Sequence, residues 1–400
     1  MYKSINIFTS ESDFESARAV LPYISLNYIE ETNVIKCVER PNYFYIESLE
    51  DNNVVSFGVN NTWLGEKKSN IFYSFNKTNW FSLSLIDSLT LSANQYVYFK
   101  SNGSNLQKGE YTGNPNSNTK KSLFKTTKKF NVGGNVKLLL HQNDDISSGG
   151  CQYLFYSLQV VDASNLVLPA TTLADHCYNS MFSRCTSLTS APELPATTLA
   201  DGCYNSMFYD CTSLTTAPEL PATTLADGCY YYMFYNCTTL TTAPELPATE
   251  LAVSCYNFMF YNCTSLTTAP ELPATELVVN CYISMFSRCT SLITAPALPA
   301  TELAASCYNS MFDNCTSLIT APELPATTLA EGCYYDIFRN CTKLTHIKCL
   351  ATDISAYKCT SNWVNGVSST GTFIKHPDMT SWSTGVDGIP SGWEVKDYEG

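Results

Sequence analysis

The clearest hydrophobic pattern in this 400-residue chain is a 26-residue unit that occurs seven times. Within each unit the apolar positions 7, 10, 11, 14, 15 and 18 are spaced i, i+3, i+4, i+7, i+8 and i+11. This spacing predicts an amphipathic helical segment about three turns long, with one face inward. In the second unit these residues are Ala200, Cys203, Tyr204, Met207, Phe208 and Cys211. The seven units begin at Leu168, Leu194, Leu220, Leu246, Leu272, Leu298 and Leu324.

The remainder of each unit predicts a turn and a short extended run. In the second unit Asp201 is the expected helix N-cap, and Cys-Thr-Ser-Leu ends the apolar pattern with turn residues. Leu214 and Leu220 then indicate a strand, which Pro218 and Pro221 limit to a few residues because proline lacks a backbone donor. We therefore expect a short strand, a bend and a helical return in every coil.

A fixed period of this length is typical of a solenoid, because each unit buries its apolar face only by stacking on its neighbours. Equivalent side chains then lie above one another, so the Leu, Cys, Met and Phe columns should form the core. The predicted fold class is α+β and β-rich. We divide the chain into a small N-terminal attachment module (1–42), an antiparallel β-sandwich (43–147), a repeat solenoid that begins with a degenerate coil (148–349) and a C-terminal cap (350–400).

The β-sandwich is predicted from alternating polar and apolar residues in runs bounded by Asn, Gly and Ser. The runs are YFYIESLE, VVSFGV, IFYSFN, WFSLSL, YVYFKS and NVKLLLH. A lysine cluster near the end of this region indicates either a solvated strand edge that discourages unwanted pairing or a contact with an acidic neighbour. Its members are Lys120, Lys121, Lys125, Lys128 and Lys129.

The two ends of the chain have weaker patterns. Residues 10–21 predict a helix, and residues 24–38 predict a hairpin with its turn at 31–33. These form either an attachment module or a plain cap. The segment 151–169 resembles a degraded repeat, because Phe155 precedes Leu158 by three residues as Phe182 precedes Cys185. At the other end, tryptophans either seal the last coil or offer a sugar platform. They are Trp363, Trp382 and Trp393.

The order Cys-x-x-x-Met-Phe-x-x-Cys-x-x-Leu-x-x-Ala-x-x-Leu-Pro resembles the BspA-like leucine-rich repeats of bacterial surface proteins. Cys203 stands where that family tends to have Ile, Met207-Phe208 at its Ala-Phe and Cys211 at its Cys. Leu-Pro-Ala-Thr-Thr-Leu arrays are similar to those of gut Bacteroidota proteins and of their phages. The resemblance covers about half of the chain and implies a recognition or adhesion role without naming a ligand.

Charge narrows the classes of partner. The net charge is −13, and from Leu168 to Cys349 there are fifteen Asp or Glu against five Lys or Arg. This balance disfavours nucleic acid and anionic membranes as partners of the repeats. No apolar run is long enough for a bilayer span. The first twenty residues lack a basic region followed by an apolar one, so we expect no signal peptide, which favours a virion component over a secreted adhesin.

Fourteen of the eighteen cysteines occupy positions 10 and 18 of the repeats, on the predicted inward stripe. We expect reduced and packed thiols there, because buried free cysteine behaves as a small hydrophobe. Stacked coils also hold equivalent Cβ atoms farther apart than a disulfide requires. No spacing typical of a zinc site occurs, and we expect no cofactor.

A candidate ligand site comes from comparing the seven units with one another. Inward positions hardly change, whereas positions 8, 9, 12, 13, 16 and 17 vary and should face solvent. In units two to four these positions gain aromatic residues that should lie in columns. Such a patch suits a glycan or protein partner, although stacked rings could equally serve packing between coils. The candidate residues are Tyr209, Tyr231, Tyr232, Tyr235, Phe258 and Tyr261.

Other candidate chemistry is weaker. Glutamates recur at position 26 and, in three units, at position 5, but no calcium-binding loop accompanies them, so solvated edges are expected. The Leu-Pro-Ala-Thr-Thr sequence recurs internally and is interpreted as structural. Four scattered histidines and the lack of a nucleophile elbow or phosphate-binding loop give no support for an enzyme. The acid columns comprise Glu193, Glu219, Glu245, Glu271 and Glu323, with Glu250, Glu276 and Glu302.

The expected function is therefore non-enzymatic recognition. In the first hypothesis the chain is a phage virion-associated protein whose N-terminal region contacts other virion proteins. Its solenoid then presents the exposed helical face to a bacterial-surface or mucus glycan or protein. Many weak contacts, multiplied if copies form a homo-oligomer, would supply avidity. The alternative is a bacterial cell-surface adhesin of the BspA-like kind. A catalytic tail protein that degrades polysaccharide would require an acid pair in a groove, which the sequence does not indicate.

Overall fold

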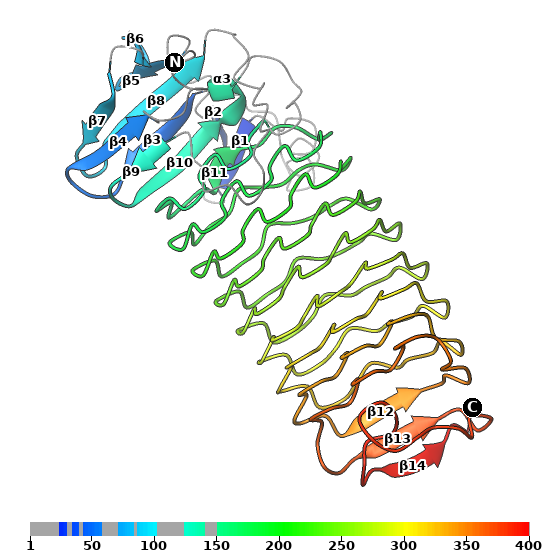
Figure 1. Ribbon diagram of the computed structural model, residues 1–400. Coiled ribbons are helices and arrows are strands. Elements are labelled where there is room, and N and C mark those ends of the chain that lie inside the picture. The colour runs from blue at the N-terminus through cyan, green and yellow to red at the C-terminus, as the bar shows by residue number, and fades with distance from the viewer. Residues whose placement is uncertain are drawn as a thin grey trace.

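The computed structural model of the chain describes residues 24–29, 34–39, 43–57, 71–83, 86–101, 124–140 and 150–399, and it is rich in β-structure (Figure 1). Within those ranges α3 (Val136–Leu140) is the one helix. The strands of the first half are β1 (Ile24–Ile29), β2 (Val34–Glu39), β3 (Phe44–Ser48), β4 (Asn53–Phe57), β5 (Ile71–Ser74), β6 (Phe81–Ser82), β7 (Ser88–Leu91), β8 (Tyr96–Ser101), β9 (Phe124–Thr126) and β10 (Phe130–Asn135). Those of the second half are β11 (Asn165–Val167), β12 (His346–Cys349), β13 (Thr372–Lys375) and β14 (Glu394–Asp397).

Strands β1 and β2 pair antiparallel from Ile24↔Glu39 to Ile29↔Val34, which confirms the predicted hairpin. They join no other described strand. The predicted helix at 10–21 and the turn at 31–33 lie outside the described residues.

Two sheets face one another in the region predicted to be a sandwich. One has the order β11-β10-β3-β8-β5-β6, and the other has the order β7-β4-β9. All their pairings are antiparallel except β10 with β11. The Phe124 ring from the smaller sheet lies 5.7 Å from Phe44 and 5.5 Å from Phe99 of the larger one. Alternate residues of each strand therefore meet in a shared aromatic core.

The run NVKLLLH was predicted as a strand, and this prediction was wrong. Val136–Leu140 is helical, and the Asn135 side chain accepts a hydrogen bond from the Lys137 backbone N–H at 2.9 Å as an N-cap. Val136 and Leu139 are buried at an i, i+3 spacing. A run this short fits both the two-residue period of a strand and the 3.6-residue period of a helix. The Asn135 cap and the burial of Val136 and Leu139 favour the helix.

The lysine cluster lies partly on a strand edge, as one of the two interpretations predicted. Strand β9 is at the edge of the three-stranded sheet, and Lys125 in its centre is exposed. Lys128 lies 3.7 Å from Glu50, and both are well exposed. Lys120 and Lys121 lie outside the described residues.

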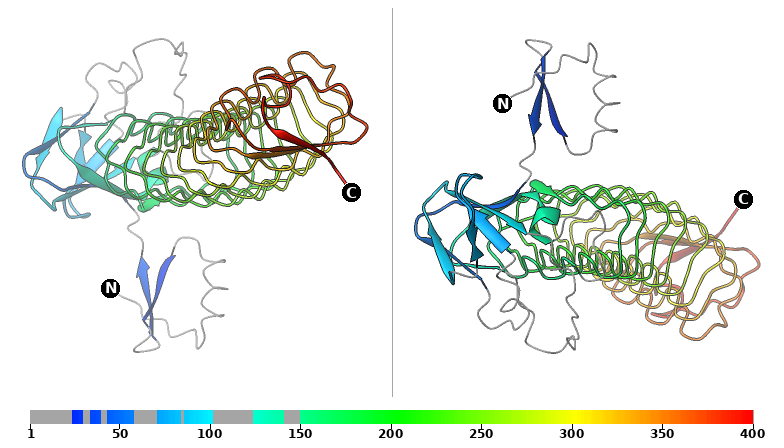
Figure 2. Two further views of the ribbon diagram at one scale, coloured as in Figure 1. Left: turned by 90° about the horizontal axis from the view of Figure 1, so that it is seen from below. Right: turned by 90° about the horizontal axis from the view of Figure 1, so that it is seen from above.

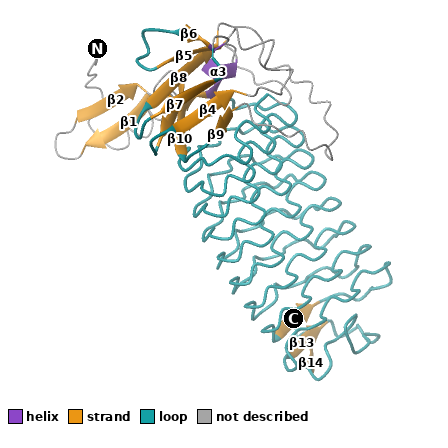
Figure 3. Ribbon diagram, turned by 60° about the vertical axis from the view of Figure 1, so that its left-hand side comes forward, coloured by secondary structure: helices purple, strands orange, loops and turns teal. Residues whose placement is uncertain are grey.

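From residue 150 onward the chain forms a stack of coils, seen from the side in Figure 1 and from below and above in Figure 2. The helix predicted for each repeat is absent: residues 168–345, all of them described, contain no helix and appear as continuous turns in Figure 3. The predicted strands are also reduced to single-residue bridges between coils, such as Thr216↔Thr242. The β-rich part of the predicted fold class is therefore correct and its helical part is wrong.

Backbone hydrogen bonds explain why the repeats are not helical. In the second unit, every other N–H closes a local turn, as when Met207 donates to the Tyr204 carbonyl at 3.1 Å. The N–H groups between them point along the stack, and Tyr204 donates to Cys229 of the next coil at 3.0 Å. Half of the backbone N–H groups in this segment thus bond to the next coil, whereas in an α-helix they would bond to carbonyls of the same segment.

The turns repeat every four residues, because positions 9, 13 and 17 of every unit have a left-handed backbone. In the second unit these are Gly202 (φ 57°), Ser206 (φ 55°) and Asp210 (φ 58°). Most units place Gly, Ser, Asn or Asp at these positions, which are the residues that tolerate this conformation best. The expected N-cap Asp201 instead accepts a hydrogen bond from the Asp227 N–H of the next coil at 3.2 Å.

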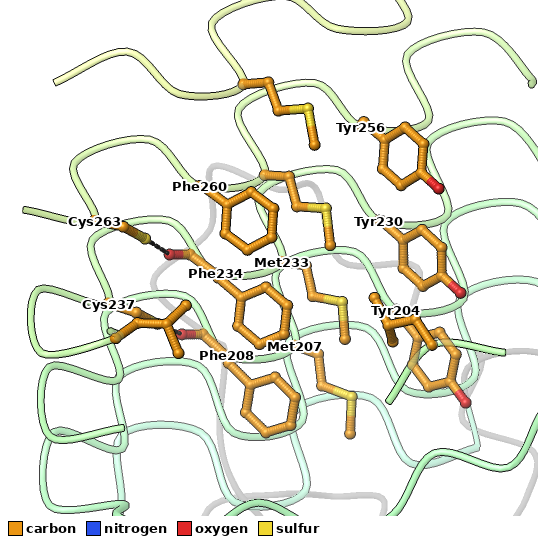
Figure 4. Close-up of a cluster of buried hydrophobic side chains, with 14 of the residues drawn as sticks. Tyr204, Met207, Phe208, Tyr230, Met233, Phe234, Cys237, Tyr256, Phe260 and Cys263 are labelled. Carbon is orange, nitrogen blue, oxygen red and sulfur yellow. Dashed lines mark hydrogen bonds between the residues drawn. The ribbon is translucent and has the colours of Figure 1, made fainter. Parts of the chain in front are cut away.

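The interior consists of columns of identical side chains (Figure 4). Phe234 is fully buried and stacks at 5.6 Å on both Phe208 and Phe260, with ring planes within 6° of parallel. A buried tyrosine column runs beside it, with Tyr204 and Tyr230 separated by 6.0 Å. The inward positions 10, 11, 14, 15 and 18 predicted from the sequence are confirmed as buried, whereas position 7, Ala200 in the second unit, is only partly buried.

The cysteines are packed as predicted. All seventeen whose side chains are described are buried and unpaired. At position 18 the thiol also donates to a carbonyl of the preceding coil, as from Cys237 to Phe208 at 3.2 Å and from Cys263 to Phe234 at 3.1 Å (Figure 4). Burial raises the pKa of these thiols, that of Cys289 to about 12.

Both ends of the stack are closed by non-repeated residues. Phe155 stacks on Phe182 at 5.1 Å and lies 6.1 Å from Phe44, so the aromatic core continues from the sandwich into the coils. At the other end Trp363 is fully buried and stacks on Trp382 at 5.4 Å. Trp393 is also buried and donates from its indole N–H to Ser368. Tryptophans thus cover the last coil beside the parallel sheet β12-β13-β14.

Candidate functional site

The six predicted aromatic residues form one continuous cluster on the outside of the coils, which we call the array patch. It comprises Tyr209, Tyr231, Tyr232, Tyr235, Phe258 and Tyr261, and each is half-buried. Tyr235 stacks at 4.7 Å on both Tyr209 and Tyr261, with planes 4° from parallel. Tyr232 stacks on Phe258 at 4.9 Å. The two columns predicted from the sequence therefore exist.

Edge contacts join the two columns into one surface. Tyr232 meets Tyr235 edge to face at 5.4 Å, and Phe258 lies 5.6 Å from Tyr261. Tyr231 contacts the side of this group, 4.1 Å from Tyr232. Since each coil contributes rings at equivalent positions, the arrangement follows from stacking the coils in register.

The orientation of the rings limits what they can bind. Both faces of Tyr235 are covered by neighbouring rings, and the Arg288 guanidinium lies 5.6 Å from the Tyr261 ring centre. Ring edges and hydroxyl groups are what this column presents to a partner. An edge-rich aromatic surface suits protein side chains better than the flat C–H face of a sugar, which requires an open ring face.

The backbone conformation is unfavourable for two of the six residues of the array patch. Tyr232 (φ 56°) and Phe258 (φ 55°) both occupy position 13, where the backbone is left-handed. A bulky residue there costs on the order of 1–3 kcal/mol, and such outliers cluster at functional sites. The other five units use small or polar residues at this position. These are Ser180, Ser206, Ser284, Ser310 and Asp336.

Burial raises the pKa of three phenols of the array patch, those of Tyr209, Tyr232 and Tyr235. Burial is the main cause that raises the pKa of Tyr209, Asp210 raises it further, and Arg184 opposes them. Burial, followed by the neighbouring tyrosines, raises the pKa of Tyr235. Burial and a hydrogen bond with Tyr231 raise the pKa of Tyr232 well above its ordinary value. These three hydroxyl groups therefore stay protonated and can donate hydrogen bonds throughout the neutral range.

An amide ladder flanks the array patch at position 17. The Asn236 side chain donates to Asp210 at 2.8 Å, and Asn262 donates to Asn236 at 2.6 Å. These bonds align the neighbouring coils and satisfy polar atoms that are partly buried. The patch therefore has a polar border of fixed geometry on one side.

A polar cluster that the sequence analysis missed occupies the same outer positions in later units. Arg339 pairs with Asp313 at 2.8 Å and with Asp336 at 2.9 Å, and both carboxylates are almost buried. Burial raises the pKa of Asp336 although Arg339 opposes it. These residues lie 26 positions apart along the chain or at i, i+3, so only the stacking of coils reveals the cluster.

The other candidates do not assemble. Each glutamate of the acid columns is exposed. Across the described ranges, no three His, Cys, Asp or Glu side chains are arranged to hold a metal ion. Nor does any helix in those ranges have the length and apolar content needed to cross a bilayer. No protein-family model matches the sequence, and no curated protein matches it.

Proposed function

We propose that this protein is a non-enzymatic recognition protein that binds its ligand through the array patch. The observation that supports this most is the placing of Tyr232 and Phe258 on left-handed backbone, where Ser or Asp serves in the other units. Packing alone does not require the strain, because the units with serine keep the same buried columns. The proposed ligand is a bacterial-surface or mucus protein or glycan, and the covered ring faces of the Tyr235 column favour a protein.

The proposal places the chain in the class of leucine-rich-repeat solenoids, with the BspA-like resemblance as its support from sequence. In this class repeated coils provide a rigid scaffold, and variable outer positions carry specificity. The binding surface is a series of turns and not a helical face, since the repeats contain no helix. Several copies in one assembly would multiply weak contacts into avidity.

Replacing Tyr235 and Tyr261 together by serine tests this proposal. The full chain, labelled with a fluorophore, is incubated with gut Bacteroidota cells and with mucin-coated beads. We expect the double variant to bind at least about tenfold more weakly, because central aromatic anchors dominate binding energy. Tyr335→Ser is the matched control, since Tyr335 is also a half-buried outer tyrosine but lies outside the array patch.

A second outcome would overturn the proposal. If the double variant bound as tightly as the parent chain and lost much of its thermal stability, these rings would serve packing between coils. Circular dichroism melts of both variants separate the two results.

We further propose a place on a phage virion, with a bacterial cell-surface adhesin as the alternative. The support is the similarity of the Leu-Pro-Ala-Thr-Thr-Leu arrays to those of Bacteroidota phages. Immunogold labelling of purified particles and of intact bacterial cells distinguishes the two. Gold on particles supports the first proposal, and gold on cells without particles supports the second.

A further inference from the structure

A second aromatic surface lies on the six-stranded sheet, on the side opposite the core. Residues of β8 alternate, so that Val97 and Phe99 are buried while Tyr96, Tyr98 and Lys100 point the other way. Tyr96 is 37% exposed, which makes its ring the most open of this group. The run YVYFKS predicted the strand but gave no indication of a site.

Strand register brings further rings to this surface, which we call the sheet patch. Tyr45 on β3 lies 5.5 Å from Tyr96 and 6.0 Å from Tyr98, in edge-to-face contacts. Next to them, Tyr43 lies 4.7 Å from Trp80, which immediately precedes β6. The Tyr96 and Tyr98 planes are nearly parallel with ring centres 6.1 Å apart, so they form a row along the strand.

Polar groups are set among these rings. Tyr96 donates its hydroxyl to Glu47 at 2.6 Å, and Asn131 donates its amide to the other Glu47 oxygen at 2.9 Å. Each carboxylate oxygen keeps a further lone pair for a ligand hydroxyl. Two ammonium groups provide donors, with Lys77 lying 4.5 Å from the Tyr98 ring centre and Lys100 lying 4.2 Å from that of Trp80.

The sheet patch is built on a rigid base. Gly133 on β10 is directly opposite Tyr45, and a Cβ on it would lie 2.3 Å from the Tyr45 ring. A larger residue there would displace that ring, which is only 9% exposed. The loop before Trp80 is fixed by Asn76, which accepts hydrogen bonds from the N–H groups of Thr78 and Asn79.

We propose that the sheet patch binds a neutral polysaccharide. Tyr96 meets Tyr45 edge to face and stays 37% exposed, so the C–H side of a pyranose can lie against its ring, whereas both faces of Tyr235 in the array patch are covered at 4.7 Å. The Glu47 carboxylate would accept from sugar hydroxyls, and the Lys77 and Lys100 ammonium groups, which lie over Tyr98 and Trp80, would donate to sugar oxygens. Mixed acceptors and donors beside aromatic rings are what a polyhydroxylated and uncharged chain requires.

Charge argues against a polyanion at this place. Within the patch Glu47 is accompanied by Lys77 and Lys100, so the patch itself carries little net charge. Two lysines together with a carboxylate are too few to bind the repeated charges of nucleic acid or an acidic polysaccharide. The sheet patch is separate from the array patch and does not depend on the function proposed for it.

Affinity electrophoresis and isothermal titration of the full chain test the inference. The probes are laminarin, xylan, glucomannan and dextran as neutral chains, with alginate, heparin and single-stranded DNA as polyanions. We expect binding to at least one neutral chain and to none of the polyanions. Tyr96→Ala should weaken it by at least about tenfold, since stacking on an aromatic anchor supplies much of the binding energy.

Two further variants show whether the Tyr96 ring or its hydroxyl matters and whether the array patch contributes to binding. Tyr96→Phe keeps the ring and should retain most of the binding, while the array double variant Tyr235→Ser with Tyr261→Ser should bind the polysaccharide unchanged. Failure of every neutral probe, preference for a polyanion, or unaltered binding by Tyr96→Ala would each overturn the inference. Loss in the array variant alone would move the glycan site to the coils.

Discussion

The array patch and the sheet patch are both aromatic, but they are built by opposite rules. In the array patch a ring is stacked against its own counterpart 26 residues away, as Tyr209 is on Tyr235 at 4.7 Å. In the sheet patch different rings meet edge to face across antiparallel strands, as Tyr45 meets Tyr96. Repetition therefore covers both faces of Tyr235, whereas strand register leaves Tyr96 in edge-to-face contact with Tyr45 and 37% exposed. Two surfaces with the same residue types thus suit different ligand chemistry.

The same contrast applies to the cores. The repeats bury thiols at two positions of every unit, and the 43–147 region contains no cysteine at all. In the repeats, half of the local N–H groups bond to the next coil, while in the sheets they bond across antiparallel strands. Each coil depends mainly on its two neighbours, but each strand depends on residues far away in sequence.

Alkaline pH should separate the two regions most strongly. Burial raises the pKa of Cys203 and Cys289 to about 12, from an ordinary value of 9.0. Above pH 9 the unfolded chain loses thiol protons that the folded chain keeps, so the free energy of unfolding falls as pH rises. The loss is about 1.4 kcal/mol per pH unit for each such thiol and is absent below pH 9.

Hydrogen exchange followed by mass spectrometry between pH 7 and pH 11 measures this, after correction for the intrinsic rate. Amides of the coils should lose protection before those of β3 and β8. Uniform loss in both regions, or coils that stay protected at pH 11, would contradict the role assigned to the buried thiols.

Removing one buried ring should have the next largest effect. Phe234→Ala deletes a fully buried side chain from the middle of the stack, and Phe99→Ala does so in the sandwich. Each should lower the free energy of unfolding by about 3–5 kcal/mol. Hydrogen exchange should show where amide protection is lost. We expect the loss in the coils on either side of Phe234 for the first variant and in the sheets for the second. A global loss from Phe234→Ala would show that coils are coupled beyond nearest neighbours.

The smallest difference between the two regions should be in how much one ion pair contributes to the free energy of unfolding. Arg339→Ala leaves the nearly buried Asp313 and Asp336 without their partner, which should cost about 1–3 kcal/mol. Lys128→Ala removes an exposed pair with Glu50 and should cost less than about 0.5 kcal/mol. Urea denaturation of the two variants beside the parent chain measures both. If both variants lost the same free energy of unfolding, burial of Asp313 and Asp336 would add nothing to their pairing with Arg339.

The helix prediction failed for a physical reason that the sequence contains. Positions 7, 10, 11, 14, 15 and 18 satisfy a period of 3.6 residues and a period of four equally well over so short a segment. The period of four is visible in the residues that favour left-handed turns, which occur every four residues, such as Gly202, Ser206 and Asp210. Only the direction of alternate N–H groups settles the choice, and that depends on the next coil being present.

The array patch was predictable because copies of one unit can be compared within a single chain. Variation at outer positions pointed to Tyr235 and Tyr261, and stacking in register follows from the period. The sheet patch was not predictable in this way. Tyr45, Trp80 and Tyr96 are far apart in sequence, and nothing local shows that β3, β6 and β8 share a sheet. The polar cluster of Arg339 was missed because the sequence does not show that the Arg339 side chain extends to Asp313 of the preceding coil.

The sequence by itself determined the period, five of the six inward positions of each unit and the reduced, buried state of the thiols, because a repeated apolar pattern can bury itself only against its own copies. Tertiary structure alone decided the turn conformation of the coils, the strain at Tyr232 and Phe258, and the gathering of rings on the sheet. Those features depend on hydrogen bonds and contacts between segments distant in sequence, for which a local pattern contains no information.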